Sequence, residues 1–199
     1  MEAEVILRIP WRFLPNLLTS VRLVLVPFII VALFSTEYLS ALIYFVIASV
    51  TDGMDGFLAR RYGWKSRLGS VLDPISDLCL LVSSAVVLWL MGHFAGWCLL
   101  VILVRDGVIL LGAILFRIVF GYLDIDPLRS GKWCAVSQML LVGVILLEVI
   151  GVERLEWIKA SLMWATVILC VVSGWFYLVV WGRKWRALER ERQLAAADR

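Results

Sequence analysis

Residues 38–59, YLSALIYFVIASVTDGMDGFLA, form an apolar stretch with two aspartates, Asp52 and Asp55, near its end. A helix needs about 20 apolar residues to cross about 30 Å of hydrocarbon, and this stretch is long enough. Five similar stretches occur at 17–34, 70–91, 95–120, 133–150 and 157–181. Apolar residues make up 62% of the chain, and the mean hydropathy is +0.94, above the values of soluble domains. The sequence therefore predicts an all-α membrane protein with six transmembrane helices.

The linkers between these stretches are too short to fold separately, so we expect a single domain over residues 1–199. Residues 1–16 mix charged, apolar and aromatic side chains, which is typical of a segment lying on the lipid headgroups. The apolar run that follows them carries Arg22 and lacks a convincing signal-peptide cleavage site, so we expect the segment to be retained. An unstructured tail is the alternative. The predicted organisation is thus a juxtamembrane segment over 1–16, a six-helix bundle over 17–181 and a basic cytoplasmic tail over 182–199.

The positions of the basic residues predict the orientation. Fifteen of the 19 Lys and Arg residues lie on one side of the six predicted spans, and only Arg154 and Lys159 lie on the other. By the positive-inside rule, both termini are then cytoplasmic. The net charge of +3 is small and the basic residues flank the spans, which predicts a bilayer rather than nucleic acid as the partner.

The four cysteines and the single histidine give weak signals. Cys79, Cys98, Cys134 and Cys170 are scattered through apolar stretches without a C-x-x-C pair, so we expect reduced, buried thiols and no zinc site or disulfide. His93 falls in a turn on the predicted outer side, away from the acidic residues, and is not expected to be catalytic.

Four aspartates carry the strongest chemical signal. Asp52 and Asp55 share one helix face, and Asp73 and Asp77 share a face of the next helix. A carboxylate inside the bilayer costs about 2.5–3.5 kcal/mol, so four of them need a counter-charge. Long basic side chains at a helix end tend to extend toward the membrane surface, away from acids deeper in the span. The basic residues near the four aspartates in sequence are Arg60, Arg61, Lys65 and Arg67. We therefore expect a pair of divalent cations, Mg²⁺ or Mn²⁺, bound by these carboxylates.

Glycines accompany the acids. Gly53, Gly56 and Gly69 leave room for a substrate to approach the backbone. Close helix packing in membranes explains such glycines equally well. A single acid of this kind could also be a packed, protonated carboxyl.

Residues 52–77 read D-x2-D-G-x2-A-R-x8-G-x3-D-x3-D. This pattern resembles the complete signature of the CDP-alcohol phosphotransferase family, and residues 15–19 with Arg22 and Pro27 resemble the start of the family's first span. The resemblance implies transfer of a phosphatidyl group from CDP-diacylglycerol to an alcohol with release of CMP. It also implies a homodimer in the bacterial inner membrane, with a cytoplasmic active site. By position it implies metal ligands at Asp52, Asp55, Asp73 and Asp77, a general base at Asp77, and a CDP pocket formed by Gly56, Ala59, Arg60 and Gly69.

The alcohol acceptor is predicted from residues further along the chain. Arg105 lies inside a span and is costly there unless it pairs or meets a ligand. Because neighbouring helical residues diverge by about 100°, we expect Arg105 to point away from Asp106 and to bind the acceptor. Arg129 and Lys132 are further candidates for phosphate contacts, or else only anchor headgroups. These features predict an acceptor that carries phosphate.

These segments resemble the branch of the family that makes phosphatidylglycerophosphate and cardiolipin, in which the acceptor itself carries phosphate. Phosphatidylglycerophosphate synthases usually carry glutamate after the equivalent arginine, and Asp106 resembles the cardiolipin synthase pattern more closely. The leading expectation is therefore phosphatidylglycerol as acceptor, with glycerol 3-phosphate as the alternative. Inositol phosphate, serine and choline stay open. Outside this family, an intramembrane metal or ion carrier would also place acids in spans. A degenerate, inactive scaffold is disfavoured by the intact motif.

Overall fold

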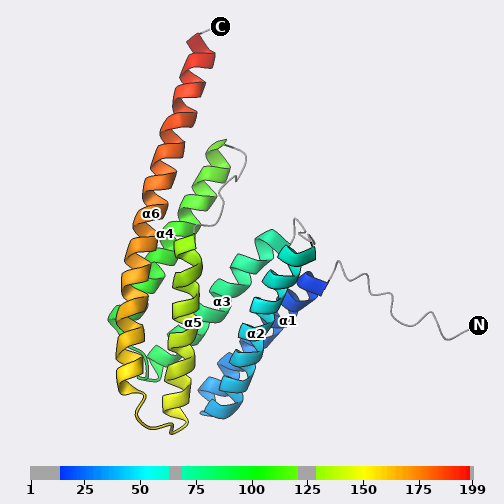
Figure 1. The fold of residues 1–199 in the computed structure, drawn as a ribbon, viewed down its shortest axis with the longest axis vertical. Coiled ribbons are helices and arrows are strands. Elements are labelled where there is room, and N and C mark those ends of the chain that lie inside the picture. The colour runs from blue at the N-terminus through cyan, green and yellow to red at the C-terminus, as the bar shows by residue number, and fades with distance from the viewer. Residues whose placement is uncertain (1–13, 63–68, 121–128, 198–199) are drawn as a thin grey trace, which may run out of the picture. The chain divides into compact units, whose positions relative to one another are not determined.

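Six helices make up the part of the chain that the computed structural model describes, which is residues 14–62, 69–120 and 129–197 (Figure 1). No strand occurs within these ranges. The predicted surface segment over 1–16 lies almost entirely outside them. The helices are α1 (Leu14–Phe34), α2 (Tyr38–Tyr62), α3 (Gly69–Leu90), α4 (Gly96–Phe120), α5 (Arg129–Val149) and α6 (Glu156–Ala197).

The all-helical prediction is confirmed, and several of the helices are apolar enough for a multi-pass membrane protein. Four helices contain segments long and apolar enough to cross a bilayer, namely Leu17–Phe34, Gly96–Phe116, Ser130–Val149 and Glu156–Arg190. The apolar parts of α2 and α3, Tyr38–Met54 and Ile75–Leu90, are shorter. They are the two helices that carry the acidic motif, whose charges interrupt the apolar run. A count of six spans therefore stays a prediction.

The chain forms two compact units, and each is described by itself. Unit 1 comprises Met1–Ala95 and Val142–Trp157, and unit 2 comprises Gly96–Leu141 and Ile158–Arg199. The single-domain organisation predicted for residues 1–199 stays a prediction.

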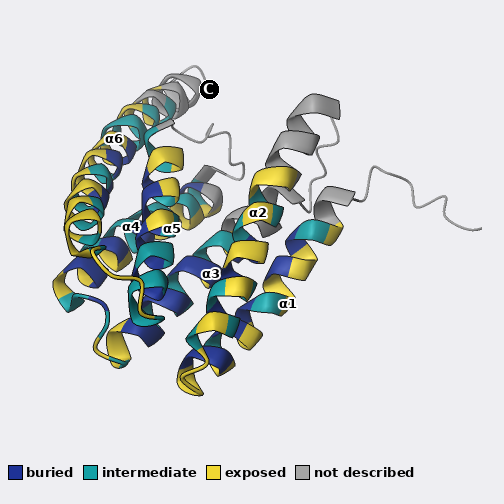
Figure 2. Ribbon diagram, turned by 60° about the horizontal axis from the view of Figure 1, so that its bottom comes forward, coloured by how far each residue is buried: buried dark blue, intermediate teal, exposed yellow. Residues whose placement is uncertain are grey.

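Unit 1 is built around α1, which packs against both α2 and α3. Buried residues recur every three or four positions along these helices, as helical periodicity requires. They include Ile29 and Leu33 of α1, Ala41, Phe45 and Ala48 of α2, and Leu81, Ala85 and Leu88 of α3. Large apolar side chains such as Val24, Phe28 and Val31 are exposed on the other faces (Figure 2). Such faces suit a lipid environment.

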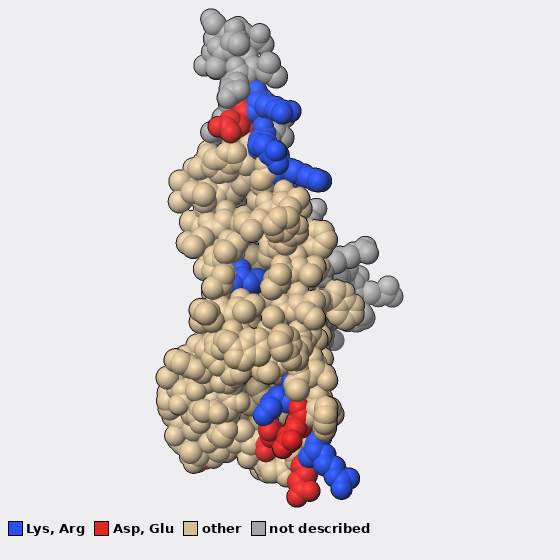
Figure 3. Space-filling model, turned by 90° about the vertical axis from the view of Figure 1, so that its left-hand side faces the viewer, with Lys and Arg blue, Asp and Glu red and all other residues tan. Residues whose placement is uncertain are grey.

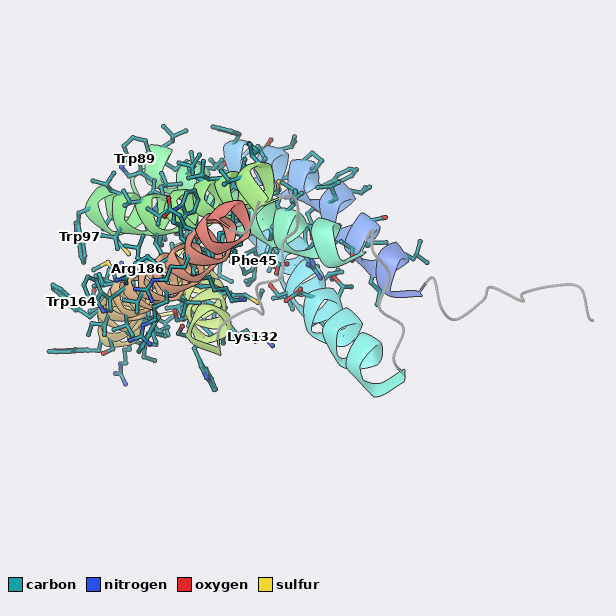
Figure 4. The ribbon with its side chains drawn as sticks, turned by 90° about the horizontal axis from the view of Figure 1, so that it is seen from above. Phe45, Trp89, Trp97, Lys132, Trp164 and Arg186 are labelled. Atoms are coloured by element: carbon teal, nitrogen blue, oxygen red, sulfur yellow. The ribbon has the colours of Figure 1, made fainter. Side chains whose placement is uncertain are left out.

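Unit 2 contains α4, the first part of α5 and most of α6. A stripe of buried residues on α6 consists of Thr166, Cys170, Ser173 and Tyr177. Gly112 of α4 makes room for a large aromatic ring, because an added Cβ there would lie 1.2 Å from Trp181 of α6. The rings of Trp97 and Trp164 lie 5.3 Å apart between their centroids and link α4 to α6 (Figure 4). Aromatic packing and the missing side chain at Gly112 thus join these two helices.

Two helix boundaries differ from the sequence prediction. The last helix continues to Ala197, well past the predicted end of the span at residue 181. Arg, Ala, Leu, Glu and Gln dominate this extension and are strong helix formers, so the helix persists where the apolar run stops. Basic side chains gather along it (Figure 3), among them Arg183, Lys184, Arg186 and Arg190. The fifth helix begins at Arg129 instead of residue 133.

Candidate functional site

The acidic motif of unit 1 is organised around an arginine from α1. The side chain of Arg22 is completely buried, and its Nη2 lies 2.8 Å from Oδ1 of Asp52 on α2. Its Nη1 donates to Oδ1 of Asp77 on α3 and, at 3.2 Å, to Oγ of Ser76. One guanidinium therefore contacts carboxylates of two different helices. Arginine suits this role because its planar fork presents several donors in a fixed geometry.

This contact corrects the expectation that the acids lack an adequate basic partner. That expectation considered only the residues that follow Asp55 in the chain. Arg22 lies near the start of the apolar run Leu17–Phe34, and Asp52 lies near the end of the run Tyr38–Met54. Because consecutive helices of a bundle run in opposite directions, these two positions come to the same level. An arginine within an apolar span was the signal that could have identified the partner.

The other two acids lie about one turn away on the same helices. Asp55 follows Asp52 on α2, and Asp73 precedes Asp77 on α3. Their side chains lie outside the part that the structure describes. The same holds for the side chains of the predicted CDP-binding positions. Of these, Gly56, Ala59 and Arg60 lie in the last turns of α2, and Gly69 is the first residue of α3.

The donors fit a hard divalent cation by their chemistry. Asp52 and Asp77 supply carboxylate oxygens, which Mg²⁺ and Mn²⁺ prefer. Their side chains are 30% and 35% exposed, so Arg22 does not enclose them. Among the residues with described side chains, no group of three or more His, Cys, Asp or Glu could hold a metal. The prediction of two ions thus depends on Asp55 and Asp73 completing the set.

Gly53 adjoins this acidic set, and no described neighbour requires a glycine at this position. A Cβ added there would meet no described atom within 4 Å. Helix packing within the described part therefore does not explain this glycine. The alternative, an approach of substrate to the α2 backbone, fits the location beside Asp52.

We expect Gly53→Ala to weaken binding of the CDP-alcohol donor while leaving the fold intact. Alanine is favoured over glycine inside a helix by about 1 kcal/mol, so the free energy of unfolding should not fall. The measurements are donor affinity and thermal unfolding in detergent. Gly143→Ala is the matched control, because a Cβ at this α5 glycine also meets nothing within 4 Å. Equal donor affinity in both variants would contradict a role for Gly53 in binding.

A second polar cluster lies in unit 2 around Arg105 of α4. Its Nη1 lies 2.6 Å from Oδ1 of Asp106, and its Nη2 donates to Oγ of Ser173 on α6 at 3.0 Å. The expectation that Arg105 points away from Asp106 was therefore wrong. The helical angle separates the Cβ atoms, but the long arginine side chain bends back to its neighbour. The Nε of Arg105 is buried and has no hydrogen-bond partner among the described residues.

The first turn of α5 approaches this cluster. A Cβ added at Gly131 would lie 3.2 Å from Nη2 of Arg105 and 3.1 Å from the hydroxyl of Tyr177. Lys132 is exposed at this end of α5 (Figure 4), and the side chain of Arg129 lies outside the described part. The structure therefore brings Arg105 to the helix end that carries Arg129 and Lys132.

Ser173 and Tyr177 were not predicted as site residues. They follow Cys170 at spacings of three and seven, which places all three on one face of α6. A polar stripe with this period inside an otherwise apolar helix was the signal available in the sequence.

Comparisons with known proteins agree with the motif. The family model described as CDP-alcohol phosphatidyltransferase matches residues 12–172. A probable phosphatidylglycerophosphate synthase of Mycobacterium tuberculosis (strain ATCC 25618 / H37Rv) is 32% identical over 172 residues, covering 83% of this chain and 79% of that protein. The CDP-diacylglycerol--glycerol-3-phosphate 3-phosphatidyltransferase of Bacillus subtilis (strain 168) is 29% identical over 194 residues, covering 88% and 97%.

These relatives favour the alternative acceptor over the leading expectation. The name of the Bacillus subtilis relative contains glycerol 3-phosphate, the alternative above, and the Mycobacterium tuberculosis relative is named a phosphatidylglycerophosphate synthase. The leading expectation depended on aspartate instead of glutamate at Asp106. In the structure this carboxylate pairs with Arg105, and a glutamate is able to make the same kind of ion pair. The difference between the two acids is therefore weak evidence about the acceptor.

Proposed function

The chain belongs to the CDP-alcohol phosphatidyltransferase family, and from that premise we propose that it transfers the phosphatidyl group of CDP-diacylglycerol to glycerol 3-phosphate and releases CMP. The membership makes it an enzyme of phospholipid biosynthesis. The choice of acceptor is supported by the names of its relatives. The observation that carries it within this chain is the basic cluster formed by Arg105 and the first turn of α5.

The donor end of the reaction is assigned to the acidic motif. Asp52, Asp55, Asp73 and Asp77 would hold two Mg²⁺ or Mn²⁺ ions. When bound, these ions offset the negative charge of the donor diphosphate and of the CMP that leaves. Gly56, Ala59, Arg60 and Gly69 would line the CDP pocket.

Asp77 is proposed as the general base. Its carboxylate would accept the proton of a glycerol 3-phosphate hydroxyl, which is a poor nucleophile until it loses that proton. The oxygen then bonds to the phosphorus of the phosphatidyl group, and the bond from that phosphorus to the oxygen of CMP breaks. Arg22 contacts the carboxylates of both Asp52 and Asp77 and keeps them in place.

The acceptor phosphate is assigned to the basic cluster of unit 2. The first turn of α5 carries Arg129 and Lys132 and no acidic residue. A helix amino terminus already has partial positive charge, so basic residues there are unfavourable without an anion. Arg105 adds a third cation, and its buried Nε has a hydrogen bond to give. A phosphate monoester would neutralise this cluster and accept these bonds.

We expect Arg105→Gln to raise the KM for glycerol 3-phosphate at least tenfold or lower kcat by a similar factor. A charge-assisted hydrogen bond contributes roughly 1.5–3 kcal/mol, which corresponds to about 10- to 150-fold. Binding of CDP-diacylglycerol should stay nearly unchanged, because the donor residues are on α2 and α3. Arg183→Gln, an exposed change on α6, is the control. Unchanged acceptor kinetics would remove Arg105 from the acceptor site.

An acceptor panel tests the proposed substrate. Purified protein with labelled CDP-diacylglycerol and Mg²⁺ is given glycerol 3-phosphate, phosphatidylglycerol, inositol phosphate or serine, and the lipid product is identified by mass spectrometry. Phosphatidylglycerophosphate from glycerol 3-phosphate is the expected product. Cardiolipin from phosphatidylglycerol alone, or product from serine alone, would contradict the proposal.

The setting of the enzyme is also a proposal. The distribution of Lys and Arg supports cytoplasmic termini and a cytoplasmic active site. The bacterial origin of the relatives supports the inner membrane, and family resemblance supports a homodimer.

A further inference from the structure

Two cysteine thiols of unit 2 lie in contact inside the protein. Cys134 of α5 and Cys170 of α6 are 0% and 1% exposed, and their Sγ atoms are 3.1 Å apart. Nε2 of Gln138 donates to both sulfur atoms, at 3.5 Å each. The sequence predicted separate reduced thiols; they are free thiols in the structure, but helix packing pairs them.

We propose that Cys134 and Cys170 are an oxidisable dithiol that forms a disulfide between α5 and α6. A disulfide bond is about 2.05 Å long, so the two sulfur atoms need to approach by only about 1 Å. A structural metal site is a poorer account of the pair. Structural zinc takes four ligands, and no group of three or more metal-ligating side chains occurs among the described residues.

A hydroperoxide is the oxidant that suits this location, because fatty-acyl hydroperoxides dissolve in the bilayer. One sulfur attacks the peroxide, the O–O bond breaks, and a sulfenic acid and an alcohol form. The second sulfur then bonds to the sulfenic sulfur and water leaves. Two thiols and one hydroperoxide thus give one disulfide, one alcohol and one water. The sulfur atoms are oxidised and the peroxide oxygens are reduced.

The surroundings of the pair favour this outcome over others. The N–H group of Gln138 is within reach of either sulfur and stabilises negative charge that develops on it. Burial keeps bulky soluble thiols away from the sulfenic acid. The neighbouring thiol therefore completes the reaction, and a mixed disulfide is not expected.

The dithiol lies one helical turn from the Arg105 cluster on both helices. Cys134 follows Gly131 by three residues, and Cys170 precedes Ser173 by three. Gly131 and Ser173 both adjoin the guanidinium of Arg105. Drawing the two helices together at the sulfur atoms should disturb these contacts. We therefore expect the disulfide to weaken acceptor binding by Arg105. This expectation rests on the proposed function, whereas disulfide formation does not.

Peptide mapping tests the disulfide directly. Reduced protein in lipid nanodiscs is treated with cumene hydroperoxide, free thiols are alkylated under denaturing conditions, and cross-linked peptides are identified by mass spectrometry. A Cys134–Cys170 peptide that reductant removes is expected. Cys79→Ser, a change at the exposed cysteine of α3, should retain it, and Cys134→Ser should lose it. Cys134 and Cys170 that stay fully alkylatable in wild-type protein, or that carry only sulfinic acid, would overturn the proposal.

Enzyme kinetics then test whether the disulfide weakens acceptor binding. The oxidised wild-type protein should show a several-fold higher KM for glycerol 3-phosphate, reversed by reductant, while the Cys134→Ser variant should not respond to peroxide. A mapped disulfide with unchanged acceptor kinetics would overturn the expected effect on acceptor binding. Reduced protein that does not use glycerol 3-phosphate at all would instead contradict the proposed function, and the peptide map would still decide on the disulfide.

Discussion

Asp77→Asn should abolish turnover while weakening CDP-diacylglycerol binding less than Asp52→Asn does. An amide does not accept the proton of the acceptor hydroxyl, and loss of a general base costs about 10²–10⁴-fold in rate. Asp52 is proposed only as a metal ligand, so its loss should act chiefly on the donor diphosphate. The measurements are single-turnover CMP release and equilibrium binding of labelled CDP-diacylglycerol.

Controls separate the base role from general damage. Glu153→Gln removes an exposed acid from the turn after α5 and should leave both quantities unchanged. The folded fraction of each variant is measured alongside, because Asp52 and Asp77 both hold Arg22. If donor affinity falls equally in Asp52→Asn and Asp77→Asn, Asp77 is chiefly a ligand and the base assignment fails.

Arg22→Met should lower the free energy of unfolding, by less than the roughly 3–5 kcal/mol that breaking a fully buried ion pair costs, because the carboxylates of Asp52 and Asp77 are 30% and 35% exposed. Arg22 is fully buried and contacts carboxylates of both α2 and α3, so its loss leaves two acids close together without their common cation. Unfolding by denaturant in detergent measures the loss. Raised Mg²⁺ should recover part of it, since metal at the same carboxylates replaces the missing charge.

A double-mutant comparison shows whether charge is responsible. In an Asp52→Asn, Asp77→Asn background, the further change Arg22→Met should cost clearly less than it does in the wild-type protein. Arg183→Met on α6 is the exposed control and should change stability by no more than about 0.5 kcal/mol. An equal cost of Arg22→Met in both backgrounds would assign Arg22 to packing alone.

The helices were predictable because apolar length and helical structure coincide through most of this chain. The apolar run and the helix end at different residues in α6. The apolar run stops near Trp181, but strong helix formers continue the helix to Ala197. Hydropathy indicates where the membrane-embedded segment ends, whereas helix propensity determines where the helix itself ends. The start of α5 was placed too late for the same reason, since Arg129 and Lys132 are polar yet helical.

The acidic motif was predictable in its residue types and spacing, whereas its partner was not. Asp52 and Asp77 were identified as neighbours of one site, but their contact with Arg22 needs the packing of α1 against α2 and α3. The pairing of Arg105 with Asp106 depends on a side-chain rotamer, which spacing does not fix. The Cys134–Cys170 contact depends on the register of α5 against α6.

The central claim is that this protein transfers a phosphatidyl group with the help of divalent metal. Release of CMP with and without divalent cation tests it most directly. Purified protein in lipid nanodiscs receives CDP-diacylglycerol and glycerol 3-phosphate after chelation, and Mg²⁺ or Mn²⁺ is then added back. We predict that CMP release falls to background in chelator and returns with metal, together with phosphatidylglycerophosphate. Full turnover in chelator would contradict the account, as would transport of metal into liposomes by a protein that releases no CMP.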